Sequence, residues 1–101
     1  MSEPTVEFAR VRRLAHRNRH GAGAAVLAVL DADCIDDLDE WIVDDAVRWI
    51  DRMLIQNGQS EERVRMTAER WSDSSPEVQG QLNELIADRL ELHAIVDRLE
   101  C

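Results

Sequence analysis

The chain has 101 residues and a formal net charge of −9, from 21 acidic and 12 basic side chains. This length fits one domain with a single hydrophobic core, and the charge disfavours nucleic acid and anionic membranes and favours a basic partner. The longest apolar stretch, Ala24 to Leu30, is far shorter than the ~20 residues of a membrane span, and the N-terminus carries no secretory signal. We therefore expect a soluble, cytoplasmic protein.

The basic residues are all arginine, and the chain contains neither lysine nor tyrosine. Arginine codons are rich in G and C, whereas lysine and tyrosine codons are rich in A and T. The composition therefore indicates a G+C-rich bacterial, phage or archaeal gene, with adaptation to high salt as the alternative cause.

The first expected element is a helix over residues 5–20, with a weak apolar stripe, which Gly21 and Gly23 interrupt. A second, short helix is expected over residues 24–32, because alanine favours a helix over a strand.

That longer helix is expected to start at Asp36 as the N-cap and to end at Asn57-Gly58, a typical left-handed exit. Its apolar side chains recur at helical spacing in two adjacent rows, as in the central helix of a bundle. Its two tryptophans, Trp41 and Trp49, are expected to add buried area.

A fourth helix is expected over residues 60–71, and Ser75-Pro76-Glu77 is a strong start signal for a last helix. That last helix carries a seam with alternating spacings of four and three, formed by Val78, Leu82, Leu85, Arg89, Leu92, Val96 and Leu99. Residues 1–101 are therefore predicted to form one all-α domain, a small four- to five-helix bundle. It would consist of a basic N-terminal helix, 5–20, and an acidic and apolar bundle, 24–100.

Charge is segregated along the chain. Residues 1–20 carry a net charge of +3 and residues 21–101 a net of −12. A basic patch could bind nucleic acid or phosphate, or it could dock on the acidic stretch of its own chain or of a neighbouring copy. The second interpretation is favoured, because no aromatic residue is interleaved with the five arginines, Arg10, Arg12, Arg13, Arg17 and Arg19.

The acidic run between residues 31 and 45 holds eight acids and no base. Closely spaced carboxylates on a rigid helix can imitate a row of phosphates, whereas the simpler interpretation is a solvated helix face. We expect the run to be a partner-binding surface formed by Asp31, Asp33, Asp36, Asp37, Asp39, Glu40, Asp44 and Asp45.

Metal sites and catalysis have little support. The acidic run does not match the EF-hand pattern of ligands, and the chain has no paired-cysteine motif or recognisable nucleophile with its base. His16 and His20 lie one helical turn apart, and a transition-metal site with Cys34, His93 and Cys101 is an alternative that the sequence leaves open. We expect no cofactor, no bound metal and no enzymatic activity, and we expect free thiols rather than a disulfide.

Arg89 interrupts the apolar seam of the last helix, and Asp45 interrupts an apolar row of the central helix. If Arg89 is buried, the two are predicted to pair, because one unpaired buried charge is strongly destabilising. The same seam could also meet its counterpart across a two-fold axis. We therefore predict a homodimer with Arg89, Leu92, Val96 and Leu99 in its interface.

Together these patterns favour a non-catalytic protein that acts by protein–protein contact. The expected role is that of an inhibitor or adaptor, encoded by a phage or mobile element, of an enzyme that handles nucleic acid or serves host defence. A nucleic-acid-binding accessory protein that uses residues 10–20 is the first alternative, and a metal-binding helical bundle is the second.

Overall fold

The computed structural model describes residues 8–32, 34–72 and 75–99. Within these ranges the chain forms four α-helices and no strand, which confirms the all-α class. The elements are α1 (Ala9–Arg17), α2 (Gly23–Asp31), a single 3-10 turn η1 (Ile35–Asp37), α3 (Glu40–Arg70) and α4 (Pro76–Leu99).

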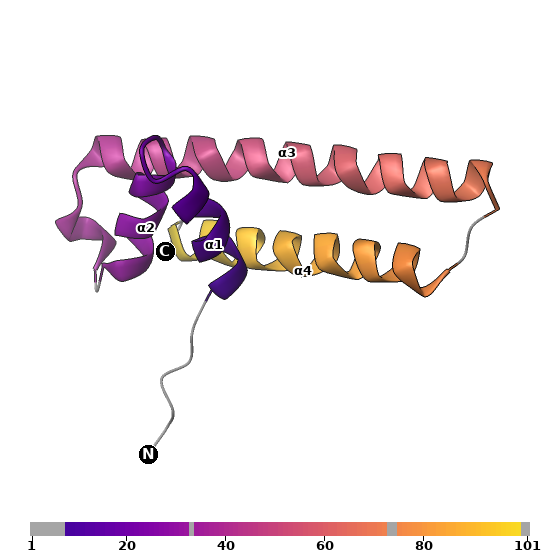
Figure 1. The fold of residues 1–101 in the computed structure, drawn as a ribbon. Coiled ribbons are helices and arrows are strands. Elements are labelled where there is room, and N and C mark those ends of the chain that lie inside the picture. The colour runs from indigo at the N-terminus through magenta and orange to yellow at the C-terminus, as the bar shows by residue number, and fades with distance from the viewer. Residues whose placement is uncertain (1–7, 33, 73–74, 100–101) are drawn as a thin grey trace, which may run out of the picture.

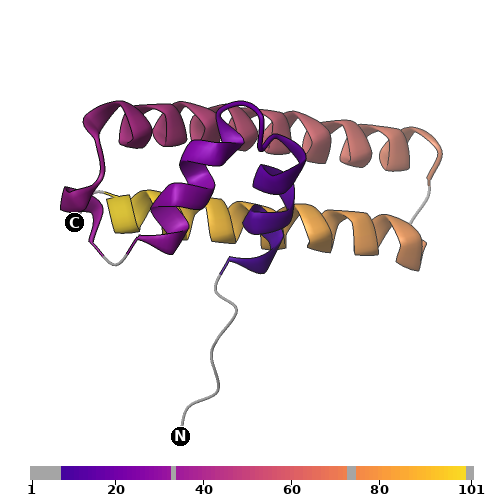
Figure 2. The same cartoon turned by 60° about the vertical axis from the view of Figure 1, so that its left-hand side comes forward.

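The two long helices, α3 and α4, lie side by side and antiparallel, as Figures 1 and 2 both show. The two short helices cover only one end of this hairpin, with α2 packed on α3 and α1 packed on α2 and α4. The far halves of α3 and α4 extend beyond them as a bare pair of helices (Figure 1). The molecule is therefore elongated, with extents of 51 × 36 × 25 Å.

The hydrophobic core lies at the end where all four helices meet. Trp49 and Ile50 of α3 and Ile95 of α4 are fully buried there, packed against the apolar faces of α1 and α2. The prediction that Trp49 is buried is confirmed, whereas Trp41 is 62% exposed and adds little to the core. Trp41 is followed by Ile42, which packs against the core in its place.

The expected exit at Asn57-Gly58 is wrong, because α3 runs through it without a break. The side chain of Asn57 is buried between the long helices, and its Nδ2 donates a hydrogen bond of 2.8 Å to the backbone oxygen of Leu85 on α4. Gly58 has no neighbour within 4 Å of where a Cβ would stand, and its φ is not positive. The predicted third and fourth helices are therefore one helix of 31 residues.

Two other boundaries also differ from the predictions. Asp36 lies in the 3-10 turn η1, and α3 begins after it with Asp39 as its N-cap. The first helix ends at Arg17, before the predicted His20, and the predicted residues 5–7 lie outside the described part of the chain.

Gly23 was expected to interrupt the first helix, but it is the first residue of α2. A Cβ there would stand 2.3 Å from the backbone oxygen of Ala15. The absence of a side chain thus allows α1 and α2 to approach closely at their junction.

Candidate functional site: an acidic end with an exposed tryptophan

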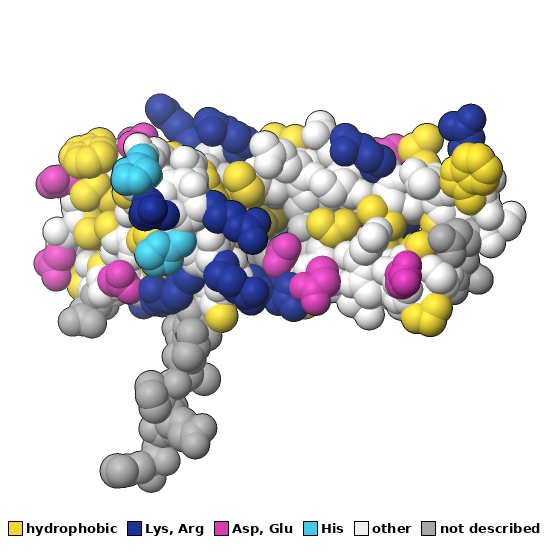
Figure 3. Space-filling model, viewed as in Figure 1, with side chains coloured by type: hydrophobic (Ala, Val, Ile, Leu, Met, Phe, Trp, Pro, Cys, Tyr) yellow, Lys and Arg dark blue, Asp and Glu magenta, His cyan; other side chains and the backbone are white. Residues whose placement is uncertain are grey.

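Most of the predicted acidic surface forms one end of the molecule. Its carboxylates come from the last residue of α2, from η1 and from the first turns of α3, and acidic side chains gather at this end in Figure 3. Asp33 lies outside the described residues. We call the other seven the acidic end: Asp31, Asp36, Asp37, Asp39, Glu40, Asp44 and Asp45.

Nearly all of these carboxylates face solvent, and only Asp45 is half-buried. One of them is paired: Oδ1 of Asp31 accepts a hydrogen bond of 2.8 Å from Nη1 of Arg12. Within the described part of the chain, the other six make no ion pair and no side-chain hydrogen bond. Asp39 is the N-cap of α3, yet its side chain makes no capping hydrogen bond.

Local structure explains part of this accumulation of acids. The N-terminus of a helix carries a partial positive charge, so Asp39 and Glu40 are favourably placed at the start of α3. Asp44 lies beyond the first turn, where the helix dipole contributes little. The helix dipole therefore explains the position of only some of the carboxylates at the acidic end.

An exposed aromatic side chain stands among these acids. Trp41 lies in the first turn of α3 next to Glu40, and Asp44 and Asp45 follow it at the i+3 and i+4 positions of the same helix face. Nearby, a shallow hollow of about 420 Å³ has Ile35, Leu38 and Val43 among its lining residues, with acids around them. The acidic end therefore combines unpaired charge with apolar surface.

The predicted basic patch divides into two groups. The guanidinium of Arg10 contacts Glu84 and Asp88 of α4, and its Nε lies 3.9 Å from Oε2 of Glu91. Arg12 pairs with Asp31, as described above. The other three are exposed and form no ion pair with any described residue: Arg13, Arg17 and Arg19.

The ion pairs of Arg10 shift the pKa values of their members in the direction that favours the charged forms. The hydrogen bond from Arg10 lowers the pKa of Glu84, and the charge of Arg13 contributes in the same direction. The pKa of Arg10 rises because Glu84 and Asp88 both accept hydrogen bonds from it. The arginine that begins the basic patch therefore serves to hold α1 on α4.

Glu91 adds a second connection between these helices. Its Oε1 accepts hydrogen bonds from the backbone N–H groups of Arg10 and Val11, at 3.1 and 3.2 Å. These N–H groups belong to the first turn of α1, where no carbonyl of the same helix can accept them. A residue of α4 therefore caps α1, a contact that no sequence signal near α1 indicates.

The predicted interface residues lie mostly inside the molecule. Leu92 is buried in the core, and Val96 and Leu99 pack half-buried against it. The side chain of Arg89 is 32% exposed and pairs with Glu61 of α3, so the predicted partner Asp45 is wrong. This face of α4 is thus occupied by the other helices of the same chain.

The residues of the alternative transition-metal site do not come together. His16, His20, Cys34 and His93 are all exposed, and Cys101 lies outside the described residues. In the described ranges, no group of three or more His, Cys, Asp and Glu side chains is placed to hold a metal ion.

Comparisons with protein families, with curated proteins and with solved structures found no match. None of the helices in the described ranges combines the length and the apolar character that crossing a membrane requires.

Proposed function

We propose that this protein acts without catalysis, by binding the basic surface of a protein partner through its acidic end. Its carboxylates take the positions of phosphates, and the partner is an enzyme that handles nucleic acid or serves host defence. The protein then works as an inhibitor or as an adaptor of that enzyme.

One observation carries this proposal: Trp41 is exposed in the middle of carboxylates that lack partners. An exposed tryptophan does not make a helix face more soluble. Tryptophan is, however, enriched among the residues that contribute most of the binding energy in protein interfaces. Charged residues around such a centre steer the encounter and select a partner of opposite sign. The combination favours a protein partner over simple solubility.

The shallow hollow at the acidic end supports the same conclusion. Its lining combines three apolar residues, Ile35, Leu38 and Val43, with three acids, Asp36, Glu40 and Asp44. Apolar and polar side chains are likewise combined in protein-binding surfaces.

A capture experiment tests the proposal. The protein is immobilised and exposed to a nuclease-treated lysate of the cells that encode it, or of their host if the gene belongs to a phage. We expect a discrete protein that the Trp41→Ala variant and a variant with Asp36→Asn, Asp37→Asn and Asp44→Asn no longer retain.

Matched controls lie elsewhere on the surface. Trp71→Ala removes another exposed tryptophan, and Asp51→Asn with Glu62→Gln and Glu69→Gln removes three other exposed acids. Both variants should retain the partner. Equal loss of the partner in the test and control variants would contradict a specific role for the acidic end.

A second candidate function is nucleic-acid binding by α1. It is favoured by Arg13, Arg17 and Arg19, which are exposed without carboxylate partners in the described structure. It is opposed by Arg10 and Arg12, which already pair with acids of the same chain. A gel-shift titration at physiological salt should give no complex tighter than about micromolar, because few phosphate contacts are available. A nanomolar complex that is lost with Arg13→Ala and Arg17→Ala would reverse this ranking.

A further inference from the structure

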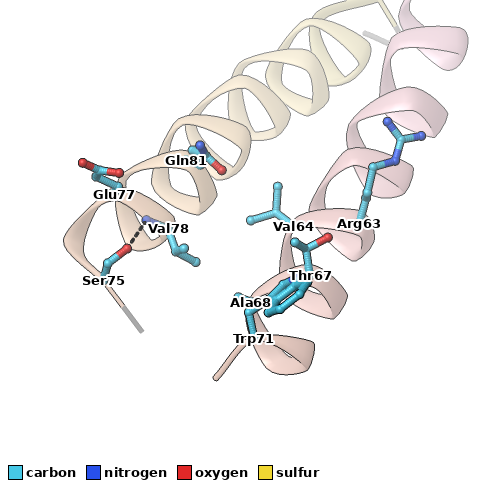
Figure 4. A pocket seen from close by; sticks show the side chains of 9 residues that line it. All are labelled: Arg63, Val64, Thr67, Ala68, Trp71, Ser75, Glu77, Val78 and Gln81. Carbon is cyan, nitrogen blue, oxygen red and sulfur yellow. Dashed lines mark hydrogen bonds between the residues drawn. The ribbon is translucent and has the colours of Figure 1, made fainter. Parts of the chain in front are cut away.

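The bare half of the helical hairpin carries a groove between α3 and α4. Its volume is about 390 Å³. In Figure 4, Val64, Thr67, Ala68 and Trp71 of α3 face Val78 and Gln81 of α4 across it. Trp71 is 74% exposed, and Met66 on a neighbouring face of α3 is also exposed.

This groove continues the face of the hairpin that α1 covers at the other end. Leu14 of α1 lines a hollow together with Ser60 of α3 and Leu85 of α4. Thr67 lies seven residues after Ser60 on α3, and Val78 lies seven residues before Leu85 on α4, so both are closer to the hairpin tip. Seven residues are about two helical turns, so each lies on nearly the same face of its helix as the residue it is counted from. Beyond α1, the same face of the hairpin has no described helix to cover it.

The low net charge of the hairpin tip permits a second copy of this chain as the cover. Residues 58–83 contain three arginines and five acids, a net charge of −2, whereas residues 31–45 carry eight acids and no base. Two hairpin tips can therefore approach with little repulsion, while a strongly basic or strongly acidic partner finds no matching field there.

The groove is also complementary to itself. Glu77 lies near the hairpin tip and Arg63 lies two turns back along α3, and both line the groove. Neither forms an ion pair with a described residue. In an antiparallel arrangement about a two-fold axis through the centre of the groove, each tip lies over the inner end of the other groove, so Glu77 of one copy meets Arg63 of the other. The same arrangement places the two acidic ends at opposite extremes of the pair.

We infer that a second copy of this chain covers the groove between α3 and α4, in an antiparallel dimer with Trp71 of each copy in the interface. Small side chains at the centre, Thr67 and Ala68, allow close approach of the helices. This dimer uses a different surface from the predicted interface at Arg89 to Leu99, and it does not rest on the proposed function. The uncovered stretch is only about 15 Å long, ten residues of helix, so the interface is small and we expect a weak dimer.

Sedimentation equilibrium of the full chain tests this inference at loading concentrations from about 5 to about 500 µM. We expect a shift from the 11.6 kDa monomer to twice that mass. Trp71→Glu should remain monomeric throughout, and Trp41→Glu, at the other end of α3, should associate as the native chain does. Both side chains are exposed, so both variants should keep the helical circular dichroism of the native protein.

Charge reversal tests the antiparallel arrangement. Arg63→Glu alone and Glu77→Arg alone should each weaken the dimer at least tenfold, because each places like charges opposite one another twice. An equimolar mixture of these two variants should recover association, since both contacts are then between opposite charges.

Three results would overturn the inference. They are a native chain that stays monomeric at 500 µM, a dimer that depends on Trp41 and not on Trp71, and a mixture of the charge variants that does not associate.

Discussion

Nη1 of Arg89 on α4 donates a hydrogen bond of 2.6 Å to Oε2 of Glu61 on α3. Glu61 also accepts a hydrogen bond of 3.1 Å from Arg65, one turn further along α3. The charge that interrupts the apolar seam of α4 is therefore compensated by a carboxylate of the helix packed against it. This contact, rather than one with Asp45, explains an arginine at this position.

The pairing of Arg89 with Glu61 predicts coupling between substitutions at the two positions. Arg89→Gln and Glu61→Gln should each lower the thermal midpoint, and the double variant should lose less than the sum of the two. Asp45→Asn should combine additively with Arg89→Gln. Thermal unfolding of the three single and two double variants measures this, and strict additivity between Glu61 and Arg89 would show that the contact contributes nothing.

The same contact predicts a dependence of stability on pH. The hydrogen bond from Arg89, with a further one from Arg65, lowers the pKa of Glu61 below its ordinary value of 4.5. A carboxyl with a lowered pKa contributes stability above its ordinary pKa and loses that contribution as the pH falls through the folded-state value. The difference in thermal midpoint between the native chain and Glu61→Gln should therefore be largest near neutral pH and shrink below about pH 4.5.

Two glycines should respond to alanine in opposite directions. Gly58→Ala should stabilise the protein by about 0.5–1 kcal/mol, because alanine is the better residue inside a helix and the space is open. Gly23→Ala should destabilise it, because the new Cβ meets the backbone of Ala15 and Asn18. Denaturant titrations decide both. A loss of stability with Gly58→Ala would indicate that the chain leaves the helix at Asn57-Gly58.

The two tryptophans in the first half of α3 should differ sharply in their effect on stability. Trp49 has no exposed surface, so Trp49→Ala should cost about 3–5 kcal/mol of unfolding free energy. Trp41→Ala should stay within about 0.5 kcal/mol, as is usual for exposed positions. Comparable losses in chemical denaturation would mean that α3 is rotated relative to this account.

Local sequence signals predicted the elements that depend on local interactions. Ser75-Pro76 marks the start of α4, where Oγ of Ser75 lies 3.4 Å from the backbone nitrogen of Val78 as its hydrogen-bond acceptor. The continuity of α3 could not be predicted in this way. Asn57 and Gly58 favour an exit locally, and only the contact of Asn57 with α4 identifies this position as helical.

The same distinction applies to the candidate site. The acidic run is visible in the sequence, but the exposure of Trp41 depends on which face of α3 the short helices cover. The cap that Glu91 provides for α1 and the bond between Arg89 and Glu61 join residues far apart in the chain. Helical spacing alone cannot show which of the many carboxylates forms each of these two contacts.

The central claim is that the acidic end occupies a surface on which the partner binds nucleic acid. Its most direct test is a competition, in which the captured partner is held on the immobilised protein and duplex DNA is added in increasing amounts. We expect the DNA to release the partner completely, with half-release at a concentration that rises with the amount of this protein present. A partner that binds the DNA and this protein at the same time, with no loss of either, would contradict the claim.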